Sequence, residues 1–260
     1  MTTLEAQLLA HGKRLDARKW SDHRDPHQIT FLPCSLVQVT QNNTLVTCKI
    51  TAEICTPPAD QPSQGLFTLS VIEPSPTSLP STLEYLFKEG KCLDLESLCL
   101  HPASRVWHIR VEVRVLQLEQ PQSSAAECAS VAVLAALLRF RRPEVRTKKG
   151  SERDSPANGN GVPLGLKQNV IAVQVAWGKA QGALLADPTG TEAEALDSAV
   201  VFGVNGQREM IGCWKSGGEG LHPEALLAMA HSAVVRGLQV IEAVKEAVKN
   251  EAVKGEVLNK

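Results

Sequence analysis

A dense run of basic side chains is the part of this sequence with the plainest chemical potential. Cationic side chains hold phosphate groups by charge and hydrogen bonding, and a guanidinium can do so with two parallel donors. The run also follows a predicted helix, at whose end cations complement the negative pole of the helix dipole. For the run as a whole we favour a solvated helix end, with a phosphate-binding surface as the alternative. The six residues lie within eleven positions: Arg139, Arg141, Arg142, Arg146, Lys148 and Lys149.

Patterns typical of metal sites and nucleophiles are missing from the sequence. None of the seven histidines forms a His-x-x-x-His pair on a predicted helix, and no serine lies in a nucleophile elbow. The glycines of residues 158–161 lack the lysine and helix start of a phosphate-binding loop. The seven cysteines never form a C-x-x-C pair, which is typical of reduced thiols in an intracellular protein. We therefore expect no metal and no cofactor.

Composition limits the kinds of partner. With 260 residues the chain can bury a substantial core, as one domain or as two fused halves. The net charge is −1, so no global positive field attracts nucleic acid, and any such contact must be local. Aromatic residues make up 4%, which argues against a platform that stacks on single-stranded bases. Because no basic-then-apolar start and no apolar run of about 18 residues is present, we expect a soluble, non-secreted protein with no membrane contact.

The first half is predicted to be a sheet followed by a buried helix. Residues 106–115 alternate apolar and charged side chains, the pattern of a half-buried antiparallel strand, and the phase slips at Leu116. Residues 125–140 are almost wholly apolar and small, which favours a helix buried on most sides that stops at Pro143. The other predicted elements are helices over 3–11 and 82–89 and strands over 35–40, 44–53 and 66–72.

The second half repeats the order of strands and then a helix. Strands are predicted over 170–177, 182–186, 198–204 and 209–214, and a long helix begins at Pro223. We expect the buried stripe of this helix to consist of Leu226, Leu227, Ala230, Val234, Leu238 and Ile241. The chain thus divides into a first half at 12–147, a linker or mobile loop at 148–162, a second half at 163–243 and a charged helical tail at 244–260.

This order of elements resembles the RNase PH-like fold, an α+β fold of the ribosomal protein S5 domain 2-like type. It has mixed sheets packed with helices in two consecutive halves. Residues 14–18 and Arg24 are similar to the family's opening Arg-x-Asp-Gly-Arg motif, with Ala17 in place of glycine. More specific resemblances, to ring subunits of the eukaryotic RNA exosome, lie at 91–99, 107–113, 140–145 and 162–165. The resemblance extends over residues 14–243 and no single motif carries it.

The resemblance implies a non-catalytic structural subunit in a six-membered ring of RNase PH-like subunits. RNA-binding cap subunits cover such a ring, and single-stranded RNA passes through its channel for 3′–5′ processing and decay. The implied location is intracellular, in the nucleus, nucleolus and cytoplasm. Two alternatives stay open: a phosphorolytic 3′–5′ exoribonuclease that is active only as a heterodimer with a related subunit, and an interaction module without RNA contact.

Phosphorolysis needs cationic donors for phosphate and an acid that protonates the leaving ribose oxygen. In active family members an arginine lies in the turn before the buried helix, but residues 122–126 of this chain read Gln-Ser-Ser-Ala-Ala. The position of the family's acid falls near Ala193, between Glu192 and Glu194. The carboxylate of Asp187 is expected to cap the turn before Pro188 and not to bind a metal. We therefore expect no catalytic residue in this chain.

Four basic residues are the candidates for RNA contact: Lys88, Lys91, Arg141 and Arg142. Lys88 stands at the position where related subunits carry an arginine that faces the ring channel. Residues 73–84, which form a longer basic loop in the family, contain no lysine or arginine here. Any RNA contact by this chain alone is therefore expected to be weak.

Overall fold

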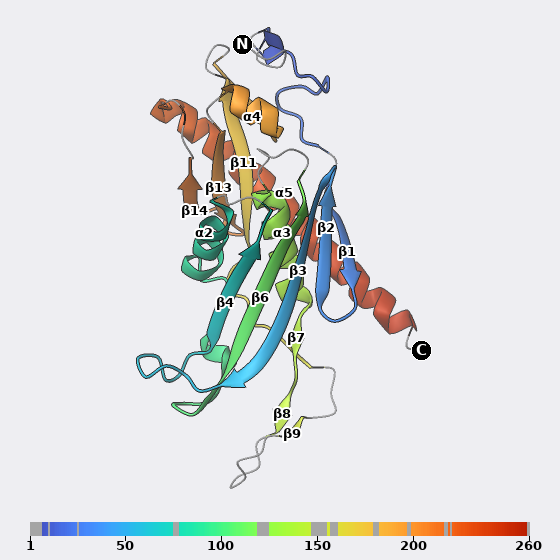
Figure 1. Cartoon of the computed structure of the whole chain (residues 1–260), viewed down its shortest axis with the longest axis vertical. Coiled ribbons are helices and arrows are strands. Elements are labelled where there is room, and N and C mark those ends of the chain that lie inside the picture. The colour runs from blue at the N-terminus through green and yellow to red at the C-terminus, as the bar shows by residue number, and fades with distance from the viewer. Residues whose placement is uncertain are drawn as a thin grey trace.

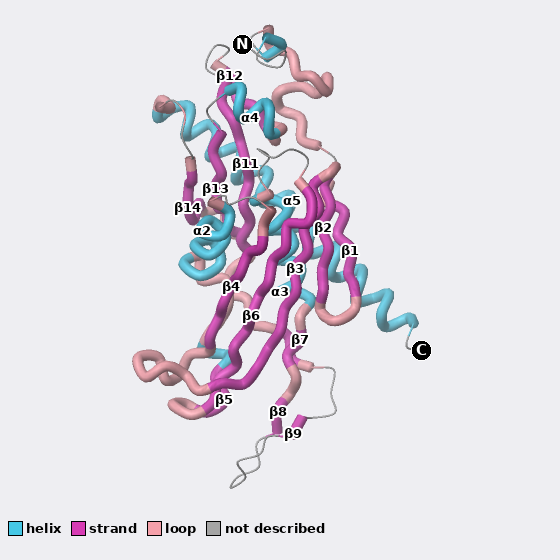
Figure 2. Tube along the Cα trace, in the orientation of Figure 1, coloured by secondary structure: helices cyan, strands magenta, loops and turns pink. Residues whose placement is uncertain are grey.

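The computed structural model describes residues 7–9, 11–24, 26–74, 78–118, 125–146, 155–156, 161–178, 182–196, 199–215, 218 and 220–258. These residues form two large sheets and two short ribbons, with helices packed between and beside the large sheets (Figures 1 and 2). The predicted helix over 3–11 lies largely outside the described residues, although residues 7–9 are helical. The turn at 122–126 and the linker at 148–162 are also described only in part.

The larger sheet has, among the described residues, six strands in the order β1-β2-β3-β6-β4, with β5 beside β6. Strand β4 runs parallel to β6 and all other neighbours are antiparallel, so the sheet is mixed, as predicted. The strands are β1 (Gln28–Leu32), β2 (Leu36–Gln41), β3 (Thr44–Cys55), β4 (Leu66–Ile72), β5 (Cys99–His101) and β6 (Arg105–Gln117).

Strand β6 confirms the period-two pattern. Ile109, Val111 and Val113 point into the core, whereas Arg110 and Arg114 on the opposite face are exposed. The predicted slip at Leu116 is a bulge, because β3 pairs Val46 with Val115 and then Leu45 with Gln117. The exposed Leu116 is the extra residue, so the apolar side chains of β6 stay on the core face up to the bulge.

Helix α3 (Ala126–Arg139) lies at the centre of the molecule. It contacts β2 and β3 of the larger sheet, the second sheet and the C-terminal helix, and its residues up to Leu137 are buried (Figure 1). The hydroxyl of Ser130 donates to the carbonyl of Glu127 and accepts the Ala172 N–H, each at 2.9 Å. This hydroxyl therefore joins the central helix to the second sheet without leaving a buried donor unpaired.

The second sheet has four described strands in the order β12-β11-β13-β14, all antiparallel. Each predicted strand is confirmed to within two residues. Helix α4 (Gly190–Leu196) precedes β13, and the long helix α5 (Pro223–Leu258) packs on β11 and β13. The strands are β11 (Val170–Gly178), β12 (Ala183–Ala186), β13 (Ala199–Asn205) and β14 (Met210–Trp214).

The predicted buried stripe of α5 is wrong in its first turns. Leu227 is 70% exposed and Leu226 is 37% exposed, while Met229 is fully buried. The face is rotated because Gly237 lies against Val204 and Ile171, where an added Cβ would approach their side chains to 3.2 and 3.4 Å. The residues that α5 buries are Ala225, Met229, Ala233, Val240, Ile241 and Val244.

Helix α5 continues without a break past residue 244, and Val244 itself is buried. The predicted tail therefore starts inside the packed part of the helix.

By length and mean hydropathy alone, 1.2 over its most apolar 18-residue window, α5 could cross a membrane. Its buried stripe and its contacts with α3 and β11 instead make it a core helix of this fold.

The predicted helix over 82–89 is two elements. Helix α2 (Leu79–Glu84) passes directly into a single π-helical turn, η1 (Tyr85–Glu89), which ends at Gly90. A Cβ at residue 90 would lie 2.2 Å from the Leu86 carbonyl oxygen, so glycine is required there. A one-turn π-helix shifts the following side chains relative to the helix before it, and such turns occur often at functional sites.

Two short ribbons and a 3-10 turn complete the described chain. Strand β7 (Arg141–Arg142) pairs with β10 (Val162–Pro163), and β8 (Val145–Arg146) pairs with β9 (Ser155–Pro156). Turn η2 (Glu96–Leu98) leads into β5. The β7–β10 pair brings the end of the first half to the start of the second.

Candidate functional site

A buried ion pair fixes the N-terminal segment onto the second half. The guanidinium of Arg14, whose side chain is fully buried, donates from Nε and Nη2 to the two carboxylate oxygens of Glu192, at 2.9 and 2.8 Å. Its remaining donors reach the carbonyl oxygens of Ala186 and Asp187, each at 3.0 Å. Such bidentate geometry is the strong form of the arginine–carboxylate pair.

Asp187 is the partner of a second arginine. The Arg24 guanidinium donates to both Asp187 oxygens at 2.7 to 3.0 Å, and the Arg24 backbone N–H donates at 2.8 Å. Burial opposes ionisation of Asp187, but the hydrogen bonds and charge of Arg24 outweigh it and lower its pKa to about 2. Asp187 is therefore structural, as expected, but it binds the N-terminal segment and does not act as a simple turn cap.

These pairs decide what the carboxylates near the expected acid position can do. Glu192 is almost fully buried and also accepts the Thr189 N–H at 2.9 Å, so its oxygens are committed to Arg14 and to the start of α4. Glu194 is exposed. Neither arrangement resembles a carboxylic acid that is held ready in a cavity to give up a proton.

A third carboxylate lies at the N-terminal end of α3. Glu127 is buried, with its Oε1 3.3 Å from Arg236 Nη2 and 3.6 Å from His27 Nε2. Burial raises the pKa of Glu127 to about 7, although Arg236 opposes the shift. Burial, with help from Arg236, lowers the pKa of His27 to about 4. Glu127 is the only acidic residue in α3, and this charge inside an apolar helix is the signal that sequence inspection could have used.

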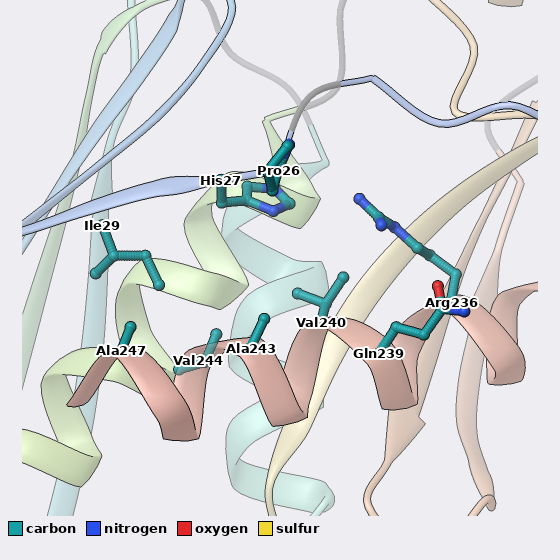
Figure 3. Close-up of a pocket in the computed structure, with 9 residues that line it drawn as sticks. All are labelled: Pro26, His27, Ile29, Arg236, Gln239, Val240, Ala243, Val244 and Ala247. Carbon is teal, nitrogen blue, oxygen red and sulfur yellow. The ribbon is translucent and has the colours of Figure 1, made fainter. Parts of the chain in front are cut away.

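A groove opens beside this cluster, between β1 and α5 (Figure 3). Its volume is about 130 Å³. Arg236 lies at one end, Ile29 and Ala247 lie at the other, and small apolar side chains of α5 form most of the floor (Figure 3). The lining residues are Pro26, His27, Ile29, Arg236, Gln239, Val240, Ala243, Val244 and Ala247. A site this apolar and this small suits a side chain better than a nucleotide.

Lys88 and Lys91 lie together at the end of η1. Lys88 is partly exposed and its Nζ is 2.5 Å from Glu84 Oε1, one helical turn earlier. The Lys91 backbone N–H donates to the Lys88 carbonyl at 3.0 Å, and Lys91 has a φ of +46°, in the left-handed region. Its side chain is exposed. Both ammonium groups can thus reach a ligand on this surface, and the Glu84 contact is solvent-exposed and weak.

Arg141 and Arg142 form a separate pair on β7. Arg141 is exposed, whereas Arg142 is half-buried and donates from Nη2 to the Ser97 carbonyl at 3.3 Å. Partial burial lowers the pKa of Arg142. The chain from Lys91 to Ser97 runs between the two pairs, and no hydrogen bond or ion pair among the described residues joins them. The four candidates thus lie on two different parts of the chain, the end of η1 and strand β7.

The first member of the basic run is structural. Arg139 donates to the Leu32 carbonyl at 2.9 Å and lies over the Phe31 ring, 5.1 Å from its centroid. This guanidinium fixes the end of α3 to β1 and is not available to a ligand. Lys148 and Lys149 lie outside the described residues.

A family model and a solved structure both match this chain. Residues 170–236 match the model of the 3′ exoribonuclease family, domain 2. A chain of the Archaeoglobus fulgidus exosome with RNA bound to the active site superposes with a TM-score of 0.74 at 17% identity, over 92% of this chain and 95% of that one. The fold is RNase PH-like, and the predicted fold class is confirmed.

Relatives in sequence are components of one kind of complex. Exosome complex component RRP45 of Danio rerio is 30% identical over 94% of this chain. The protein of the same name from Schizosaccharomyces pombe is 26% identical over 95% of this chain and 89% of its own length. The chain spans 65% of the Danio rerio protein and 58% of the Homo sapiens one.

Proposed function

We propose that this chain is a non-catalytic structural subunit of the RNA exosome core ring, of the type of exosome component nine. In this role it contributes to the channel through which RNA passes for 3′–5′ processing and decay. Its partners are other RNase PH-like subunits in a six-membered ring, RNA-binding cap subunits and single-stranded RNA. It works inside the cell, in the nucleus, nucleolus and cytoplasm.

The observation that carries the proposal is the buried carboxylate of Glu127. A helix N-terminus is a favourable place for a phosphate, because its first N–H groups have no partner within the helix. Here the protein's own carboxylate lies in the first turn of α3, with Arg236 as its counter-charge. An incoming phosphate would meet the Glu127 side chain in the first turn of the helix and would find Arg236 already hydrogen-bonded to it.

The carboxylates of Asp187 and Glu192 support the same view. Phosphorolysis needs an acid that gives its proton to the leaving oxygen, and the free energy of that step depends on the acid being protonated before transfer. Asp187 is ionised at neutral pH, because Arg24 lowers its pKa to about 2, and Glu192 is bound to Arg14. The ion pairs of Asp187 and Glu192 are accounted for by a structural role, and neither carboxylate needs a catalytic role to explain its position.

Clean preparations of the chain test the absence of catalysis. We expect 5′-labelled RNA to keep its length when it is incubated with the chain and inorganic phosphate. Release of nucleoside diphosphates in proportion to the amount of this chain would overturn the proposal. The same assay on a reconstituted pair with a related subunit tests the heterodimer alternative, since Glu194→Ala should leave its rate unchanged.

Lys88 tests the RNA contact. If its ammonium meets one phosphate of a single strand, Lys88→Ala in the assembled ring should lower the log–log salt slope of RNA binding by about 0.7. Lys245→Ala is the matched control, because Lys245 is also exposed and paired with a glutamate on its own helix. Equal effects of the two substitutions would remove Lys88 from the channel surface.

A further inference from the structure

An exposed tyrosine lies beside the lysine proposed to contact RNA. Tyr85 is the only tyrosine in the sequence, it opens η1, and it is 47% exposed. Its ring meets the ring of Trp214 on β14 edge to face, with centroids 5.7 Å apart and an interplanar angle of 79°. Two aromatic side chains from distant parts of the sequence therefore meet at one surface.

The fold makes room for this pair. The indole of Trp214 lies against Gly212 and Gly203, where an added Cβ would come within 2.6 and 3.1 Å of its ring atoms. A side chain at either position would force the indole away from the sheet. The two glycines thus leave room for the Trp214 indole over β13 and over its own strand, and Trp214 in turn contacts the Tyr85 ring edge to face.

Cationic side chains flank the aromatic pair. Lys88 follows Tyr85 by three residues on the same π-helical turn, and Lys91 follows at the positive-φ position after Gly90. Proteins that hold single-stranded RNA combine aromatic rings, on which bases stack, with lysines and arginines along the phosphate backbone. The low aromatic content of the chain argued against such a platform, but the fold gathers two of its few aromatic side chains here.

We propose that Tyr85, supported by Trp214, is a stacking site for one base of single-stranded RNA whose adjacent phosphate meets Lys88. The site rests on the proposed function, because RNA reaches this surface only in a channel-lining subunit. It adds a residue that the sequence comparison with the family does not indicate. Stacking recognises the ring face of any base, so the site holds RNA without selecting a sequence.

A protein neighbour is the competing occupant of this surface. Met210, at the other end of β14, is 52% exposed, and β14 is an outer strand of its sheet. The two lysines favour RNA, because interface cores between proteins are depleted in lysine while RNA-binding surfaces need it. The test therefore measures assembly and RNA binding separately.

The experiment uses the chain assembled with its ring partners and a fluorescent single-stranded RNA of mixed sequence. Tyr85→Ala should weaken binding by about fivefold or more, the lower end of the loss for one stacked base, and should leave the salt slope unchanged. Tyr85→Phe should bind like the unmodified protein, because the ring is retained. Ultraviolet irradiation should crosslink RNA to the peptide that contains Tyr85.

Each other outcome overturns the stacking site and says what replaces it. If Lys88→Ala weakens RNA binding and Tyr85→Ala does not, the channel role stands and stacking is wrong. If neither substitution changes binding and no crosslink forms, RNA does not contact this surface, and the channel contact proposed for Lys88 fails together with the stacking site. If Tyr85→Ala instead releases the chain from the ring on gel filtration, the surface is a protein interface.

Discussion

Arg14 and Glu192 form a bidentate ion pair between residues 178 positions apart in the sequence. Both side chains are out of solvent, so each charge depends on the other. Removing one partner of such a pair leaves a buried, uncompensated charge, which costs about 3–5 kcal/mol. We therefore expect Glu192→Gln to lower the free energy of unfolding by several kcal/mol, as measured by urea denaturation.

The matched control is an exposed pair of the same chemistry. Glu242→Gln removes the partner of Lys245 on α5, and exposed pairs of this kind contribute about 0.3–0.5 kcal/mol. Replacing both buried partners, as Arg14→Met with Glu192→Met, should recover much of the loss. If the double variant loses as much free energy of unfolding as Arg14→Met and Glu192→Met lose together when made singly, the two side chains are not directly paired.

Ala17 offers a stabilising substitution. Its φ is +61°, in the left-handed region where a Cβ costs roughly 1–2 kcal/mol. Ala17→Gly should raise the free energy of unfolding by up to about 1 kcal/mol after the extra freedom of the unfolded chain is counted. Ala228→Gly, on the exposed face of α5, is the control and should lower it by about 1 kcal/mol.

The burial of His27 and Glu127 gives a pH dependence with two opposing parts. The pKa of His27 falls from 6.5 to about 4 on folding, so the free energy of unfolding decreases as pH falls through that range. The pKa of Glu127 rises from 4.5 to about 7, so the free energy of unfolding decreases as pH rises through that range. Each change corresponds to about 3 kcal/mol, and the two largely cancel between pH 4.5 and 6.5.

Single substitutions should uncover each part. With His27→Gln we expect stability to fall as pH rises from 4.5 to 7, and with Glu127→Gln we expect it to fall as pH drops from 6.5 to 4. Thermal unfolding across this range measures both. Parallel pH profiles for the two variants would show that these groups do not titrate as their burial requires.

Ser130 tests how the central helix is joined to the second sheet. Ser130→Ala would leave the buried Ala172 N–H without its acceptor, at a cost of about 1–3 kcal/mol. Ser81→Ala is the control, because the Ser81 hydroxyl donates to the Ser78 carbonyl at an exposed helix start. A loss no larger than in the control would mean that a water molecule replaces the hydroxyl.

The fold was predictable where local pattern and tertiary environment agree. Strand β6 alternates because one of its faces is buried, and α3 is apolar all round because it lies between two sheets. Strand β1 was not predicted, since it is a short outer strand with no fully buried side chain. The buried face of α5 was misplaced because the close approach of Gly237 to β13, and not the positions of leucine, decides it.

The site was less predictable than the fold. Lys88, Lys91, Arg141 and Arg142 were identified by type and resemblance, but only a folded chain can place them in two separate pairs. The partners of Asp187 and Glu192 come from the N-terminal segment, and no local pattern encodes pairs across such separations. The aromatic pair of Tyr85 and Trp214 depends on glycines in two strands and escapes sequence inspection for the same reason.

The long reach of the N-terminal ion pairs constrains the time course of biosynthesis. Arg14 is synthesised before its carboxylate partner Glu192, which is made 178 residues later. At about 5–20 residues per second this interval is roughly 10–35 s. During that interval the first sheet can form, while residues 11–24 must wait with their cations in water. The opening segment of the chain is therefore among the last to dock on the nascent protein.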